Sequence, residues 1–311
     1  MTTTHRQRPA DEPVEEDQRP DDAHPLKSGI VVGVDPSPSG TAALEWALRE
    51  AVSTCVALHA VRAWSPNAYA MQAYAYAAAE IEPMEADQAQ LEADEQLKLA
   101  AERVAGADRI ACTATAVFGA ASQVLVEQAT HNGMLVVGSR SHGALSRAVL
   151  GSVSSSVLHH AAGPVTVVPE PRDSDGTAPR VIVGVDHSPA ALLALAAAAD
   201  QAHRRGATLV PVYVHEPIET PRGRGYAAGL ARLEDSERHR LHDAAKAAGA
   251  ADVQAEVFVG LPSALLLATA RPQDLLVVGS RGRGGFTGLL LGSTSTQLAQ
   301  HAPCPVLVIR A

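Results

Sequence analysis

The sequence predicts an α/β protein made of two tandem copies of one domain, each a mostly parallel five-stranded sheet with helices on both faces. Three observations support this fold class. The 311-residue chain is long enough for two domains. Two sequence blocks occur twice, and short runs rich in Val, Ile and Leu alternate with longer Ala-rich stretches. Such alternation is typical of β-α-β units.

The duplication is visible in two blocks. Residues 30–38 read IVVGVDPSP, and residues 181–189 read VIVGVDHSP. The sequence LVVGSR at 135–140 recurs at 276–281, and a Gly-Ser pair follows it in both copies. The first block recurs after 151 positions and the second after 141, so the second copy is ten residues shorter between them.

The duplication predicts the domain boundaries. We expect a disordered acidic tail because this segment is rich in Pro and charge and poor in large apolar residues. A short polar stretch between the copies is expected to be a linker. The predicted units are the tail at 1–28, a first domain at 29–170, the linker at 171–179 and a second domain at 180–311.

The elements of the first copy follow from its apolar runs. Near-continuous apolar strands are typical of parallel strands buried on both faces. The first helix is predicted at 39–51, because Ser/Thr-type capping residues precede it and Leu44 and Leu48 share one face. Longer helices are expected at 72–105 and, in the second copy, at 227–248. The predicted strands are 30–34, 56–64, 113–118, 134–137 and 165–168.

Composition excludes several classes of protein. There are 34 acidic and 25 basic residues, and the formal charge of −9 argues against binding nucleic acid or an anionic membrane. None of the three lysines follows a glycine, so no Walker-type P-loop exists. Three widely spaced cysteines, the absence of a signal peptide and apolar stretches too short to span a bilayer predict a cytoplasmic protein.

The most specific motif is a glycine loop in the second copy. Gly279 and Gly282 follow a predicted strand, and nine residues separate Gly282 from the pair Gly292-Ser293. Glycines let the backbone approach a ligand and adopt positive φ, so that N–H groups point at a phosphate. A helix beginning at Ser293 would offer further N–H groups, and Arg281 would add positive charge. The loop therefore predicts a polyphosphate site at the carboxyl end of the sheet.

With the Val-Gly-Val-Asp strand before it and the sequence HAPCPVLV after it, this spacing resembles the ATP-binding class of the universal stress protein family. The resemblance covers residues 28–311 and implies two Rossmann-like domains of the adenine nucleotide α-hydrolase-like type. It also implies that ATP is the ligand. In the second copy the implied ATP-binding residues are Gly184, Asp186, Val214, Gly279, Ser280, Arg281, Gly282, Arg283, Gly284, Gly285, Gly292, Ser293 and Thr294.

The first copy matches the same pattern with one departure. Ser141 stands where the family has its second glycine, and a Cβ at a position of positive φ costs about 1 kcal/mol. We therefore expect the second site to bind more tightly than the first. The implied residues of the first site are Gly33, Asp35, Ala63, Gly138, Ser139, Arg140, Ser141, His142, Gly143, Gly151, Ser152 and Val153.

Simpler interpretations exist for parts of these motifs. Glycines at a strand-to-helix turn often serve close packing, and Asp35 and Asp186 are also suited to capping the helices that follow them. His239, His242 and Asp243 share a helical face, but the arginines beside them favour a solvated charged surface over a metal site. The presence of the full pattern in both copies favours nucleotide binding.

Three functions remain open at this stage. The first is an ATP-binding regulatory module of the stress response. The second is a slow ATPase or autophosphorylating enzyme, with Asp186 or Asp35 helping to hold Mg²⁺ and Ser293 or Ser152 as acceptor. The third is an interaction scaffold, and AMP or a flavin is also compatible with a phosphate loop. The resemblance further implies pairing of the final strands, 164–168 and 305–309, within one chain or between chains in a homodimer.

Overall fold

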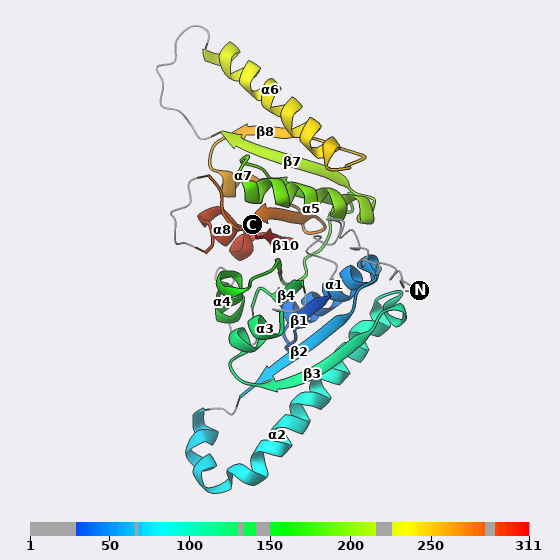
Figure 1. The fold of residues 1–311 in the computed structure, drawn as a ribbon, viewed down its shortest axis with the longest axis vertical. Helices are drawn as coiled ribbons and strands as arrows, with labels where there is room; N and C mark the ends of the chain where they lie inside the picture. Colours follow the sequence, from blue (N-terminus) through cyan, green and yellow to red (C-terminus); the bar gives the residue numbers. More distant parts are fainter. Residues whose placement is uncertain are drawn as a thin grey trace, which may run out of the picture.

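The two copies form one continuous ten-stranded sheet. A computed structural model describes residues 29–65, 68–129, 133–140, 150–215, 226–283 and 290–310. The strand order is β3-β2-β1-β4-β5-β10-β9-β6-β7-β8, so each copy contributes five consecutive strands. Every pair within a copy is parallel. The predicted α/β class with mostly parallel sheets is confirmed, and the two sheets are joined edge to edge (Figure 1).

The elements follow the predicted alternation of strands and helices. The strands are β1 (Ile30–Gly33), β2 (Leu58–Trp64), β3 (Cys112–Phe118), β4 (Met134–Gly138), β5 (Val165–Val168), β6 (Arg180–Gly184), β7 (Thr208–His215), β8 (Glu256–Val259), β9 (Leu275–Gly279) and β10 (Val306–Ile309). The helices are α1 (Pro38–Thr54), α2 (Ala68–Arg103), α3 (Ala121–Ala129), α4 (Ser152–His160), α5 (Pro189–Arg205), α6 (Tyr226–Ala247), α7 (Pro262–Thr269) and α8 (Ser293–His301), with a short 3₁₀ helix at Ala107–Arg109.

The final strands of the two copies join the sheets. β5 and β10 pair antiparallel, with Val306 opposite Val167 and Val308 opposite Val165. On their other edges, β5 pairs with β4 and β10 pairs with β9. The expected pairing of the final strands is therefore found within one chain. Because both edges of each strand are occupied, the expected alternative of pairing between chains through the same strands is not available in this fold.

Helices cover both faces of the sheet, and successive strand residues point to opposite faces. Ile30 and Val32 belong to one buried cluster and Val31 to the other. The first cluster lies under α1, α2, α5 and α6, and the second under α3, α4, α7 and α8. Both clusters contain residues of both copies, so the joined sheet has a continuous core on each face.

The first helix of each copy begins and ends in the same way. Ser37 and Ser188 are the N-caps of α1 and α5, and each accepts a hydrogen bond from a first-turn N–H, with proline at the next position. The C-caps are Cys55 and Gly206, with φ of 55° and 57°. This left-handed conformation suits glycine and strains a residue with a Cβ.

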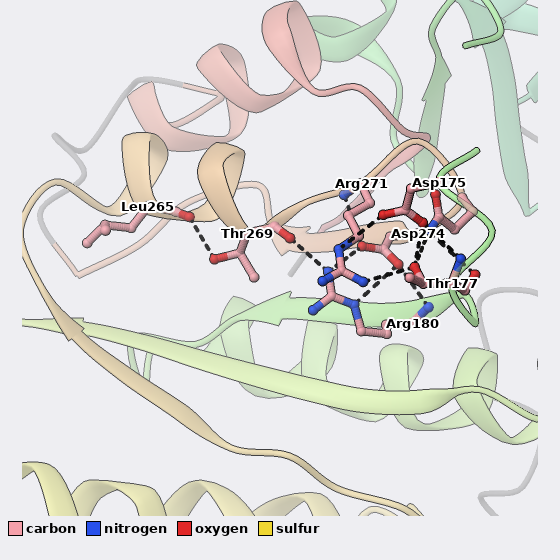
Figure 2. Close-up of polar contacts among 8 residues, drawn as sticks. Asp175, Thr177, Arg180, Leu265, Thr269, Arg271 and Asp274 are labelled. Carbon is pink, nitrogen blue, oxygen red and sulfur yellow. Dashed lines mark hydrogen bonds and ion pairs between the residues drawn. The ribbon is translucent and has the colours of Figure 1, made fainter. Parts of the chain in front are cut away.

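Polar contacts hold the linker against the amino-terminal edge of the second copy (Figure 2). The buried carboxylate of Asp274 accepts hydrogen bonds from the backbone and the guanidinium of Arg180, at 3.0 and 2.7 Å. Arg271 donates to the hydroxyl of Thr177 at 2.9 Å and lies 3.7 Å from the carboxylate of Asp175. These contacts lie at the end of the sheet opposite the glycine loop, so they fix the linker without entering the candidate site.

Across the described ranges, none of the helices combines the length and the apolarity needed to cross a bilayer. The three cysteines, which the sequence places far apart, are free thiols in the structure. The acidic tail at 1–28 lies outside the described residues.

Candidate functional site

A cavity of about 960 Å³ opens at the carboxyl ends of the second-copy strands. Its walls include Gly184 at the end of β6, His215 at the end of β7 and Gly279 at the end of β9, together with Ser293 at the start of α8. Ligands of open parallel sheets bind at this edge. The volume lies within the range of small-molecule sites.

The structure brings most of the predicted second-copy residues together around this cavity. Ser280 is the exception among the described ones. It is buried, its N–H donates to the Ile309 carbonyl at 2.7 Å, and its own carbonyl accepts from the Gly292 N–H at 2.7 Å. Gly284 and Gly285 lie outside the described residues. The predicted residues that line the cavity are Gly184, Asp186, Val214, Gly279, Arg281, Gly282, Arg283, Gly292, Ser293 and Thr294.

Sequence reasoning missed the apolar and aromatic wall. Tyr213 lies between two histidine rings, with its centroid 5.2 Å from His187 and 4.8 Å from His215. The sequence signal that could have located this wall was the mostly apolar run of β7 on either side of Val214. Further residues that the sequence did not single out are Val185, Ala191, Val212, Pro262, Leu266, Val278, Leu291 and Ser295.

Two glycines are required by close contact at this site. A Cβ on Gly279 would lie 2.9 Å from the backbone carbonyl carbon of Ala190, and a Cβ on Gly282 would lie 2.4 Å from Oδ2 of Asp186. Neither glycine has φ in the left-handed region, contrary to the sequence expectation. Their role is therefore to let β9 approach α5 and to let the loop approach Asp186.

Asp186 ties the first strand of the second copy to the glycine loop. Its carboxylate accepts hydrogen bonds from the Ser188 N–H at 3.0 Å and from the Arg283 N–H at 2.8 Å. Burial alone would raise the pKa of this carboxyl, but the hydrogen bonds from Ser188 and Arg283 outweigh it and lower the pKa. Asp186 is therefore a fixed anion that orders the loop, and the N-cap of α5 is Ser188 instead.

The amino terminus of α8 faces the cavity without a capping side chain. Gly292 is its N-cap and provides no side-chain acceptor. Ser293 and Thr294 occupy the first turn and line the cavity. Uncapped first-turn N–H groups and the positive end of the helix dipole favour an anion, and a phosphate suits this position.

The first copy uses different contacts around its loop. The carbonyl of Arg140 accepts hydrogen bonds from the hydroxyls of Ser39 and Ser37, at 2.6 and 3.2 Å. Asp35 bonds within its own turn, accepting from the Ser37 N–H at 2.9 Å and from the Ser37 hydroxyl. The N-cap of α1 is Ser37, so neither predicted aspartate caps its helix.

Two sequence differences between the copies distinguish the turns that hold the two aspartates. Pro36 is restricted to negative φ, whereas its counterpart His187 has φ of 62° and bonds to the buried Glu237 of α6. A Cβ on Gly40 would lie 2.2 Å from Oδ1 of Asp35. The counterpart of Gly40 is Ala191, so the conformation of Asp35 is sterically excluded for the second-copy aspartate.

Other first-copy residues have mainly packing roles. A Cβ on Gly33 would meet Leu125 at 2.7 Å, and one on Gly138 would meet the Ser39 backbone at 2.8 Å. Ser139 is buried and donates its N–H to the Val168 carbonyl at 2.8 Å. Ala63 lies on β2, Gly151 caps α4, and Ser152 and Val153 form its first turn. Ser141, His142 and Gly143 lie outside the described residues.

Comparisons with known proteins agree with this duplicated architecture. The model of the universal stress protein family matches residues 29–169 and again 178–310. A universal stress protein of Mycobacterium tuberculosis is 35% identical over 302 residues, covering 91% of this chain and 95% of that protein. One from Mycolicibacterium smegmatis is 35% identical over 290 residues, with coverage of 91% and 97%.

Solved structures show the same fold. A universal stress protein from Archaeoglobus fulgidus superposes with a TM-score of 0.61 at 21% identity, covering 91% of this chain and 98% of that one. A structure from Pseudomonas aeruginosa gives a TM-score of 0.60 at 19% identity, with coverage of 92% and 94%.

Proposed function

This chain belongs to the universal stress protein family, and we propose that it binds ATP in the cavity of its second copy and acts as a regulatory module of the stress response. The observation that carries the proposal is the cavity of about 960 Å³ at the carboxyl ends of β6, β7 and β9, with the uncapped start of α8 in its wall. It combines an apolar side for a base with a polar side for phosphates.

The donors on the polar side fit a triphosphate. Arg281 and Arg283 supply positive charge, and Ser293 and Thr294 supply hydroxyls and first-turn N–H groups. No lysine is needed, because backbone N–H groups and arginines provide the donors. Asp186 points its carboxylate at the Arg283 N–H and keeps the loop in place.

The apolar side fits a planar base. Val212 and Val214 belong to β7, Leu266 comes from α7 and Val278 from β9. Tyr213, which alternates with these valines on β7, packs against the cluster on the opposite face of the sheet and contacts two histidine rings. Apolar walls with few polar groups are typical of sites for ring-containing ligands. We propose adenine as the base because the residues of this wall follow the family pattern at Gly184, Asp186 and Val214.

The first copy is proposed to bind ATP more weakly. The Arg140 carbonyl of the first-copy loop accepts a hydrogen bond from the hydroxyl of Ser39, whose counterpart Ala190 has no hydroxyl. The counterpart of Gly282, where a Cβ would crowd Asp186, is Ser141, which lies outside the described residues. The proposal therefore favours one tightly bound nucleotide per chain.

The experiment is to purify the full chain from cells under native conditions and to identify and count the nucleotides released on denaturation. We expect ATP at about one molecule per chain. Two molecules per chain would show that both copies bind equally, and a preparation with no nucleotide that also fails to take up added ATP would reject the proposal. Incubation of the loaded protein with Mg²⁺ distinguishes a binding module from a slow ATPase, since only an ATPase releases phosphate.

A regulatory role needs a state that the nucleotide favours. The second-copy loop and α8 are the elements that ATP would order, and α8 belongs to the buried cluster that continues into the first copy. The chain is proposed to work in the cytoplasm, where free thiols such as its three cysteines persist. The pairing of copies inside one chain replaces, in this proposal, a homodimer built on the final strands.

A further inference from the structure

A second cavity, of about 350 Å³, lies where the two copies meet. We define the seam cavity by four side chains, His159 and His160 at the end of α4 and Arg281 and Arg310 of the second copy. Ala161, Ala162, Ser280 and Leu290 complete its wall. The cavity exists only because β5 and β10 place the end of α4 beside the second copy.

The ionisable side chains that line the seam cavity are all of the basic types. No carboxylate is among its described lining residues. Arg281 and Arg310 have no ion pair with a carboxylate in the described part of the chain. Two guanidinium groups in one cavity repel each other unless an anion lies between them. In agreement, burial and then the nearby Arg281 charge lower the pKa of Arg310.

Arg310 is only partly engaged by the protein. One terminal nitrogen donates to the Leu158 carbonyl of α4, which links the two copies. Its Nε is buried and has no hydrogen-bond partner among the described residues. A buried N–H without an acceptor is costly, and an oxyanion in the seam cavity would supply that acceptor.

Protein donors occupy several carbonyls in the last two turns of α4, among them those of Val157 and Leu158. Nδ1 of His159 lies 2.7 Å from the Ser155 carbonyl, and Nδ1 of His160 lies 2.8 Å from the Ser156 carbonyl. The Val157 carbonyl accepts from the Ala161 N–H. A carbonyl only accepts hydrogen bonds, so Nδ1 carries the proton in both rings, and Nε2 becomes a second donor when a ring is protonated.

We propose that the seam cavity binds a phosphate group, held by Arg281 and Arg310 with the two histidines beside it. Guanidinium groups match phosphate geometry and remain charged at neutral pH. The pseudosymmetric position is not equivalent, since Arg140 lies 3.9 Å from the Glu170 carboxylate and the counterpart of Arg310 is Pro169. The described residues of the first copy therefore do not form an equivalent site at that position.

The phosphate has two chemical sources. It is either free inorganic phosphate or the terminal phosphate of a nucleotide in the neighbouring cavity, because Arg281 lines both cavities. The first source is independent of the proposed ATP binding, and the second rests on it. The test below therefore treats them in separate arms.

In the first arm, nucleotide-free protein is titrated with inorganic phosphate by calorimetry. We expect saturable binding that is at least about tenfold weaker in Arg310→Gln, as expected for the loss of a charged donor. The matched control is Arg109→Gln, which removes an exposed arginine far from the seam and is expected to leave binding unchanged. Amide chemical shifts of wild-type protein provide a readout that does not depend on variant folding, with changes expected at residues 159–162 and 310.

In the second arm, ATP and AMP affinities are compared in wild type and Arg310→Gln. A selective loss of ATP affinity, without binding of free phosphate in the first arm, supports the cavity as the site of a nucleotide phosphate. No phosphate binding together with equal effects on ATP and AMP overturns the proposal. If ATP does not bind at all, the proposed function fails, and the first arm alone decides the seam cavity.

Discussion

Glu50 and Gln201 occupy the same position in the two copies, and the amide of Gln201 donates a 2.5 Å hydrogen bond to the Glu50 carboxylate where α1 meets α5. Arg204 and Arg205 donate to the two oxygens of the same carboxylate, at 2.8 and 2.9 Å. Glu50 is 2% exposed. The contact between the copies is therefore asymmetric, with one carboxylate from the first copy and two guanidiniums from the second.

Glu50→Gln should destabilise the chain by about 3 kcal/mol, because it leaves the partly buried Arg205 without its counter-charge and Arg204 with only that of Asp200. Burial lowers the pKa of Arg205, and the Glu50 charge opposes this effect. Urea denaturation measures the change. The control is Glu45→Gln, which removes more exposed ion pairs and should cost under about 1 kcal/mol. Equal losses for the two variants would contradict the role given to Glu50.

Cys55→Gly should stabilise the chain by about 1 kcal/mol. Cys55 has φ of 55° at the end of α1, and Gly206 fills the matching position of α5 with φ of 57°. The gain is reduced by the greater freedom of glycine in the unfolded chain. The reciprocal change Gly206→Ala should destabilise by a similar amount. Thermal melts of both variants check the pair, and destabilisation by Cys55→Gly would show that the left-handed C-cap carries no strain.

Gly40→Ala should destabilise the first copy by about 1–3 kcal/mol, because its Cβ would lie 2.2 Å from Oδ1 of Asp35 and 2.6 Å from the Asp35 carbonyl. The reciprocal change Ala191→Gly creates no clash and should cost only about 1 kcal/mol, the difference in helix propensity. Chemical denaturation of the two variants makes the comparison. A neutral Gly40→Ala would mean that Asp35 readily leaves its turn.

The carboxyl of Asp175 should titrate with a pKa of about 2. The Thr177 hydroxyl is the main cause, followed by the Thr177 N–H, and Gln273 and Arg271 add to them. The pKa of this carboxyl in the folded state lies below its ordinary value of about 4. The linker contacts therefore contribute their full stabilisation above about pH 4. Their contribution decreases as pH falls from about 4 through 2.

Carbon-13 NMR of the Asp175 carboxyl measures this titration directly. Thr177→Val removes the hydroxyl and keeps the backbone N–H, so it should raise the pKa toward its ordinary value. An ordinary pKa in the unmodified chain would mean that the contacts shown in Figure 2 do not persist in solution.

The sequence was sufficient to predict most of the fold, because each element predicted in one copy is corroborated by the corresponding segment of the other copy. The predicted strand at 30–34 is Ile30–Gly33, and the predicted helix at 39–51 is Pro38–Thr54. The long helices predicted at 72–105 and 227–248 are Ala68–Arg103 and Tyr226–Ala247. Helix ends differ by a few residues because capping and packing set them, and a periodic pattern alone does not.

The site was predicted less completely, for physical reasons. Glycines and charged residues stand out in a sequence, whereas Tyr213 and His215 belong to the wall only because β7 ends beside β6. Ser280 and Ser139 look like ligand donors, yet their backbone N–H groups join the ends of β9 and β4 to β10 and β5, the final strands of the two copies. The different conformations of Asp35 and Asp186 depend on Pro36, Gly40 and their counterparts, a steric relation that requires the folded turn.

The measurement that tests the central claim most directly is equilibrium dialysis of ATP against wild type, Gly292→Glu and Gly292→Ala. A Cβ at Gly292 would lie 3.4 Å from the Ser280 carbonyl oxygen, an ordinary contact, so the alanine variant should fold normally and serves as the size control. The glutamate places a negative charge at the start of α8, where the phosphates are proposed to bind. We predict saturable binding to wild type, at most a modest loss in the alanine variant and a loss of at least about a hundredfold with glutamate, equivalent to about 2.7 kcal/mol. Equal ATP binding by the glutamate variant and wild type would contradict the account.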